Sequence, residues 1–145
     1  MKKFVQQFFN QTNIPMNNDT VNVMEFLCEP KSVDRMIAMS DAGFPALSGV
    51  VKELEARFAD AEQFPLNHNA SDANAPNRRN VGWMIRYVMR AFGYFPVNSK
   101  ELNDMSERTR IGKTSQSIYF ATSAVYAKSD TVVPEFSITI TSDLE

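Results

Sequence analysis

Four residues of one predicted helix carry side chains that are suited to binding a macromolecule. At about 100° per residue, Arg79, Trp83, Arg86 and Arg90 fall within an arc of roughly 60°. The apolar side chains of the same stretch centre on the opposite side of the helix. An arginine fork binds phosphate through two hydrogen bonds, and an interleaved aromatic ring can stack on a base. We call these four residues the arginine–tryptophan face and interpret it as the candidate binding surface.

Three interpretations account for the side chains of the arginine–tryptophan face. A protein partner would bury Trp83 as an anchor and use the arginines as a hydrogen-bonding rim. A nucleic acid would place phosphates on the arginines and a base on Trp83, with an affinity that falls steeply with salt. In the third case, other segments of the same chain cover Trp83 and their carboxylates pair with the arginines. The sequence leaves all three open.

The charge distribution extends the basic surface beyond this helix. The formal net charge is −2, but residues 78–128 hold nine basic and three acidic groups, whereas 1–77 hold six and ten and 129–145 hold none and four. Arg108, Arg110 and Lys113 are therefore candidates for the flank of the site. Gly112, Lys113 and Thr114 resemble the end of a phosphate-binding loop. Glu107 stands where that motif requires its first glycine, so we interpret the tripeptide as a turn.

The sequence offers no convincing catalytic group. Cys28 and His68 are the only residues of their types, and His68 lies in a polar loop, so neither a cysteine–histidine pair nor a zinc site is expected. We therefore predict a protein that is not an enzyme and has no catalytic residue, metal or cofactor. The candidate acids and bases lie in helical or polar contexts typical of solvated carboxylates: Glu53, Glu55, Glu101, Asp104 and Glu107.

Apolar periodicity predicts helices over most of the first two-thirds of the chain. Val81, Met84, Ile85 and Val88 give the clearest helical spacing. We predict helices over 2–11, 19–28 with Asp19 or Thr20 as N-cap, 30–42 between Pro30 and Gly43, 45–60 with Glu53 paired to Arg57, and 77–92 between Asn77 and Gly93.

The remaining segments predict loops and strands. Residues 61–77 have no periodicity and form a predicted long loop. An extended segment is expected over 94–97, and Ser99 is the predicted cap of a short helix that ends at Met105. Strands are expected over 118–128 and 131–141, the second at a sheet edge because it contains Pro134.

Together these patterns predict an α+β fold. About five helices form the N-terminal two-thirds, and a small antiparallel sheet follows from the C-terminal third. We expect a single domain over 1–128, with an acidic strand or tail over 129–145 packed on it. Gln6 and Gln7 interrupt any signal-peptide core, and no apolar run reaches membrane-spanning length, so a cytoplasmic location without membrane contact is expected.

The function that these features favour is a cytoplasmic, non-enzymatic module for protein interaction or homo-oligomerisation. The alternative is a nucleic-acid-binding protein that loosely resembles a winged helix, with helices over 30–42, 45–60 and 77–92 followed by paired strands. The predicted loop over 61–77 is too long for the usual turn of a helix-turn-helix motif, which has about 3 to 4 residues.

Overall fold

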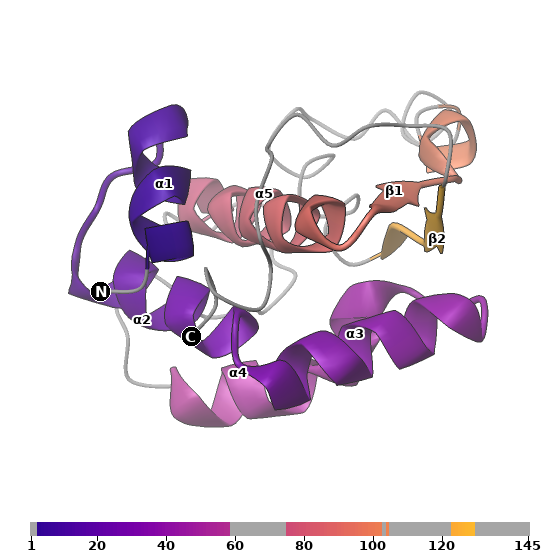
Figure 1. The fold of residues 1–145 in the computed structure, drawn as a ribbon, viewed down its shortest axis with the longest axis horizontal. Helices are drawn as coiled ribbons and strands as arrows, with labels where there is room; N and C mark the ends of the chain where they lie inside the picture. The colour runs from indigo at the N-terminus through magenta and orange to yellow at the C-terminus, as the bar shows by residue number, and fades with distance from the viewer. Residues whose placement is uncertain (1–2, 59–74, 103, 105–122, 130–145) are drawn as a thin grey trace.

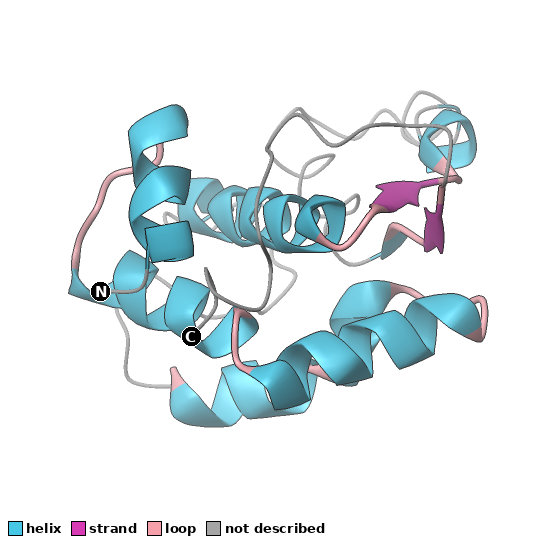
Figure 2. Cartoon of the chain, viewed as in Figure 1, coloured by secondary structure: helices cyan, strands magenta, loops and turns pink. Residues whose placement is uncertain are grey.

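The computed structural model describes residues 3–58, 75–102, 104 and 123–129. Within these ranges the fold is α+β, mostly helical with a two-stranded antiparallel sheet in the C-terminal part, as predicted (Figure 2). The elements are α1 (Lys3–Gln11), α2 (Asn18–Leu27), α3 (Pro30–Asp41), the 3-10 helix η1 (Ala46–Gly49), α4 (Val51–Arg57), α5 (Ala75–Ala91), β1 (Tyr94–Pro96) and β2 (Tyr126–Lys128).

The longest helix, α5, lies at the centre of the described fold. It contacts α2, α3 and β1. In Figure 1, α1 and α2 lie toward one end of α5 and the sheet lies at the other, while α3 and α4 run along one side. The sheet therefore adjoins the C-terminal end of α5, which holds part of the arginine–tryptophan face.

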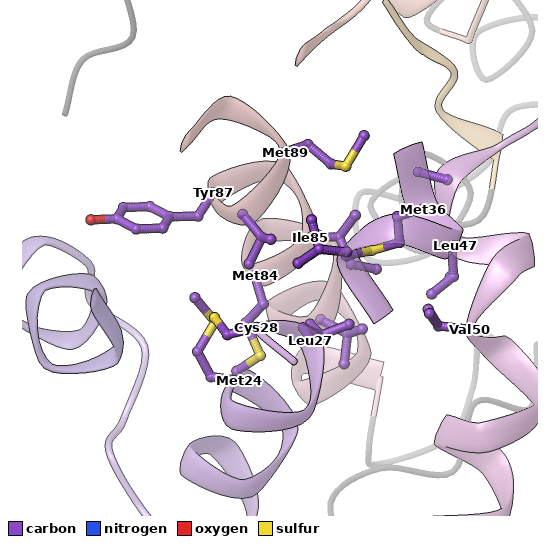
Figure 3. Packing of buried hydrophobic residues seen from close by; sticks show 14 of the residues in the cluster. Met24, Leu27, Cys28, Met36, Leu47, Val50, Met84, Ile85, Tyr87 and Met89 are labelled. Carbon is purple, nitrogen blue, oxygen red and sulfur yellow. The ribbon is translucent and has the colours of Figure 1, made fainter. Parts of the chain in front are cut away.

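The core is built around the apolar stripe of α5. Met84, Ile85 and Met89 are fully buried, and Figure 3 shows them beside buried residues of α2, α3 and η1. The predicted periodicity of this helix is therefore confirmed. Burying a side chain of this kind contributes about 1.5–3 kcal/mol, so the stripe fixes which side of α5 faces inward.

Tyr87 connects α5 to the N-terminal helix. Its ring centroid lies 5.1 Å from that of Phe4 and 4.9 Å from that of Phe8, and its hydroxyl donates to Oε1 of Gln11 at 3.1 Å. Burial raises the pKa of Tyr87 to about 12, so the hydroxyl remains protonated and available as a donor. The predicted amphipathic helix at the N-terminus thus docks on the core through its aromatic residues.

The N-cap of α2 is Asn17, so the predicted cap at Asp19 or Thr20 is wrong. The Asn17 side chain accepts from the Thr20 amide, and the Thr20 hydroxyl accepts from the Asn17 amide, both at 2.9 Å. This reciprocal capping box satisfies two amide groups that the helix leaves without partners. Threonine is a common N-cap residue, but Thr20 occupies the third helical position, where its side chain accepts from the backbone of the N-cap.

The helix predicted over 45–60 is interrupted. Residues 46–49 form η1, Val50 adopts φ −126°, and α4 then covers only Val51–Arg57. Gly49 permits the close approach of this turn to α3, because a Cβ at this position would lie 2.9 Å from the Arg35 carbonyl oxygen and 3.0 Å from Cγ of Met39. The tight 3-10 turn brings this backbone directly against α3.

The predicted local pair between Glu53 and Arg57 is replaced by two longer-range ion pairs. Glu53 lies 2.7 Å from Arg35 on α3, whose hydrogen bond and charge lower the pKa of the Glu53 carboxyl. Arg57 lies 3.1 Å from Glu29, which precedes α3. The same two residues thus tie α4 to the beginning and the middle of α3.

The ends of α5 differ in how well they were predicted. The helix begins at Ala75, before Asn77, so Asn77 is not its cap and the predicted loop reaches no further than 74. Gly93 adopts φ +84°, which ends the helix as expected, and β1 follows immediately. The rest of that loop, 61–74, lies outside the described residues.

Beyond β1 the predictions hold in part. Residues 99–102 are helical, but the Leu102 amide donates to the Asn98 carbonyl at 3.0 Å, so the helix starts one residue earlier than a cap at Ser99 would allow. The strand predicted over 118–128 is confirmed only for Tyr126–Lys128, because residue 123 is helical. The segment 118–122, the strand over 131–141 and the proposed tail after residue 129 lie outside the described residues.

Gly49→Ala is expected to destabilise the protein by about 1–3 kcal/mol, because its methyl group would overlap the α3 backbone. Urea denaturation measures the difference. Ser48→Ala, at the exposed neighbouring position, is the control and should leave stability nearly unchanged. A Gly49→Ala protein as stable as the wild type would contradict the close approach.

Candidate macromolecule-binding site

Trp83 is an exposed aromatic residue in the part of α5 whose side chains the structure describes, residues 81–91. Its side chain is 52% exposed, while the neighbouring Met84 and Ile85 have no more than 1% of their surface exposed. The core stripe of α5 rotates Trp83 outward, as the helical spacing indicates. The early helices therefore do not bury Trp83, while the long loop and the C-terminal tail, the other segments considered as its cover, lie outside the described residues.

Arg86 lies against Trp83. Its Cζ atom is 5.4 Å from the centroid of the Trp83 ring, a distance at which the cation and the π-face attract each other. The Nε of Arg86 is buried and has no hydrogen-bond partner within the part of the chain that the structure describes. One side of the indole is thus in contact with a guanidinium group, while about half of the residue's surface remains in water.

Arg90 makes the corresponding contact with the sheet. Its Cζ atom lies 6.0 Å from the ring centroid of Phe95, in the middle of β1. Both arginines are half-buried, although they lie opposite the apolar stripe of the helix. The reason is that their aliphatic stems and guanidinium planes pack on aromatic rings instead of extending into solvent.

Tyr126 adds a buried hydroxyl beside the two arginines. It is 5% exposed and stands opposite Pro96 in the antiparallel pairing of β1 with β2. Burial raises the pKa of Tyr126 to about 12, and the positive charges of Arg86 and Arg90 act in the opposite direction. The hydroxyl is therefore uncharged at neutral pH and supplies no counter-charge to either guanidinium.

We call Trp83, Arg86, Arg90 and Phe95 the Trp83 surface. The structure brings together three of the seven predicted site residues there: Trp83, Arg86 and Arg90. Arg79 lies on α5, but its side chain is outside the described part of the structure, and Arg108, Arg110 and Lys113 lie outside the described residues altogether.

Two members of this neighbourhood, Phe95 and Tyr126, were not predicted to belong to it. The sequence does hold a signal for Phe95, because Gly93 ends the helix and leaves only one residue before Phe95. A strand that turns back so closely must contact the last turn of the helix. No comparable signal exists for Tyr126, which comes from a distant segment.

Asn98 holds β2 in position next to the Trp83 surface. Its Nδ2 donates to the Ser123 carbonyl and its Oδ1 accepts from the Val125 amide, both at 2.9 Å. The Val97 amide also donates to the Val125 carbonyl at 2.9 Å. These bonds join the end of β1 to the residues just before Tyr126.

The predicted acid and base candidates form no catalytic arrangement in the described ranges. Glu53 is engaged with Arg35, and Glu55, Glu101 and Asp104 are exposed. Cys28 is fully buried beside α5, while Glu107 and His68 lie outside the described residues. Among the residues that the structure describes, no three His, Cys, Asp or Glu side chains gather where they could hold a metal ion.

Neither a family model, nor a curated protein, nor a solved structure matches this chain. The helices within the described ranges are also too short or too polar to cross a lipid bilayer.

Because Trp83 is the single tryptophan of the chain, its emission reports on this surface directly. We expect emission at long wavelength that both iodide and acrylamide quench. Arg86→Gln should weaken quenching by the iodide anion relative to neutral acrylamide, because it removes the adjacent positive charge. Arg57→Gln, which removes the comparable cation over Phe26 at 4.7 Å, should leave the ratio unchanged. Blue-shifted emission protected from both quenchers would contradict the exposure of Trp83.

Asn98→Ala is expected to loosen β2 by about 1–3 kcal/mol, because it removes two hydrogen bonds from partly buried groups. Amide hydrogen exchange at Val125 and Tyr126 measures the effect and should accelerate. Asn13→Ala, at an exposed position outside the helices, is the matched control. Unchanged protection at Val125 in Asn98→Ala would show that Asn98 does not hold the strand.

Proposed function

We propose that this protein is a non-enzymatic binding module that recognises a segment of another protein through the Trp83 surface. The observation that carries the proposal is the half-exposed indole of Trp83 with the Arg86 guanidinium packed against it. Tryptophan and arginine are enriched among the residues that contribute most to protein–protein affinity.

The packing of Arg86 on Trp83 supports a protein partner by preorganising the surface. A ring already held in place by a neighbouring side chain loses little conformational freedom when a partner covers it. The half-buried stems of Arg86 and Arg90 are restricted in the same way. A smaller part of the binding free energy is then lost to ordering these side chains when the partner binds.

The same geometry makes nucleic acid the less favoured ligand. Base stacking requires an open ring face, and the Arg86 guanidinium, 5.4 Å from the centroid of the Trp83 ring, already occupies one of the two faces. Phosphate contacts also favour cations that extend from the surface, whereas Arg86 and Arg90 are half-buried against aromatic rings. Nucleic-acid binding is therefore an outcome of the test below that would replace the proposal.

A second copy of this chain is also a less favoured partner. In a two-fold symmetric dimer that buried Trp83 against itself, Arg86 and Arg90 of one copy would approach the arginines of the other. Like charges brought together in this way oppose association. The Trp83 surface therefore fits a partner of different sequence.

The test is selection of peptides from a random display library by the 145-residue chain. Wild type is expected to enrich peptides that protect Trp83 from quenching, and Trp83→Ser should bind them at least about 30-fold more weakly, equivalent to about 2 kcal/mol. Phe44→Ser is the matched control, because Phe44 is 57% exposed on a different segment, and it should bind like wild type.

Two results would overturn the proposal. In the first, Trp83→Ser retains the selected peptides, so that the indole is not the anchor. In the second, the chain enriches no peptide but binds a defined single-stranded DNA or RNA with an affinity that falls steeply with salt. Sedimentation of the chain alone at high concentration shows whether it self-associates, which neither of these two results would reveal.

A further inference from the structure

One face of the two-stranded sheet is built from apolar side chains that face away from the core. Phe95 stands opposite Ala127 in the antiparallel pairing, so both side chains lie on the same face. The Val97 amide donates to the Val125 carbonyl at 2.9 Å, which continues the register by one pair. Because side chains alternate along a strand, this face consists of Phe95, Val97, Val125 and Ala127, and we call it the outer sheet face.

The opposite face of the sheet packs on the core. Tyr94 and Tyr126 are 6% and 5% exposed, and the Tyr94 hydroxyl donates to Oδ1 of Asp41 on α3 at 3.3 Å. An antiparallel sheet with one face on the core normally presents polar side chains to water on the other. The outer sheet face departs from this rule, because its four apolar residues are exposed or half-buried and Val97 is 64% exposed. Apolar surface of this kind marks a contact.

The chain supplies a suitable segment directly after β2. Ser129 donates to the Gly93 carbonyl at 3.0 Å, which fixes the point where the remaining residues, 130–145, leave the sheet. Apolar and hydroxyl-bearing residues alternate in that stretch, a pattern typical of a strand with one apolar side. The apolar side is formed by Phe136, Ile138 and Ile140. The outer sheet face and this segment thus both have apolar surface whose burial is favourable.

Length and charge both favour a contact between the two. An extended chain rises about 3.3 Å per residue, so Phe136 can lie up to about 23 Å from Ser129, and Ala127 of the outer sheet face is close to Ser129 along β2. Residues 129–145 hold four acidic groups and no basic one, whereas 78–128 hold nine basic and three acidic groups. Opposite charges of this kind attract the segment to the part of the chain that contains the sheet.

We infer that residues 131–141 of this chain cover the outer sheet face and bury Phe136, Ile138 and Ile140 against it. A segment tethered by a few residues has an effective concentration on the order of millimolar, so it occupies the face ahead of an untethered peptide or a second copy. The inference goes beyond the proposed function and does not depend on it, because Trp83 lies on α5 and not on the outer sheet face.

The experiment is methyl NMR of the 145-residue chain labelled at isoleucine and valine. Cross-peaks are expected between the two isoleucines of residues 131–141 and the methyl groups of Val97 or Val125. A soluble paramagnetic agent should relax the Val97 methyl groups only weakly. The buried methyl groups of Ile85 and Val88 give the reference for full protection.

Substitution of the apolar side of the segment should uncover the sheet. In the triple variant Phe136→Ser, Ile138→Ser and Ile140→Ser, the methyl groups of Val97 should lose their protection from the agent. The Ile85 methyl groups should keep their shifts, which shows that the core remains folded. The matched control is Ser137→Ala with Thr139→Ala, which alters the other side of the same segment and should leave Val97 as protected as in wild type.

Two results would overturn the inference. In the first, the agent relaxes the Val97 methyl groups as strongly in wild type as in the triple variant, so that the segment does not cover the face. In the second, the cross-peaks arise between chains in a mixture of copies labelled only at isoleucine with copies labelled only at valine, so that a second copy covers it. Peptide selection through Trp83 is measured separately, so either proposal can fail while the other stands.

Discussion

The burial of one face of α5 is the constraint on which the rest of the described structure depends. Met84, Ile85, Val88 and Met89 together remove a continuous apolar stripe from water, and α2 and α3 supply the surfaces that cover it. The free energy of burying several such side chains exceeds what any single surface contact contributes. The rotation of α5 about its axis is therefore set by the core, and the position of every other side chain on the helix follows from it.

The binding surface is a consequence of that rotation and of the way the chain leaves the helix. With the stripe turned inward, Trp83 has to face solvent. Gly93 then adopts a left-handed conformation that a larger residue would resist, and β1 can turn back immediately. This return places Phe95 under Arg90, and the pairing of β1 with β2 brings Tyr126 beside the same arginines. A helix face thus becomes a surface made from α5 and β1, with β2 packed beside it.

The contacts of the arginines explain why this surface differs from an ordinary charged helix face. Exposed arginines usually lie in solvent and contribute little to stability. Here Arg86 and Arg90 pack on rings, so their charges are held in fixed positions and are partly removed from water. Arg57 makes a similar contact with Phe26, but there Glu29 supplies a neutralising carboxylate. A cation–π contact thus occurs on α4 as well as on α5.

The sequence alone determined the regular part of this protein, because helical periodicity repeats within a short window and reports directly on what a helix buries. It predicted four of the helices closely, the stop at Gly93 and the orientation of Trp83 relative to the core stripe of α5. Predictions from local sequence were wrong where a tertiary contact determined the structure. The helix over 45–60 is interrupted where Gly49 lies against α3, and Glu53 and Arg57 pair with residues of or next to α3 instead of with each other. Only the tertiary structure joined Phe95 and Tyr126 to the arginines and made those arginines half-buried, because contacts between segments distant along the chain leave no periodic trace in its sequence.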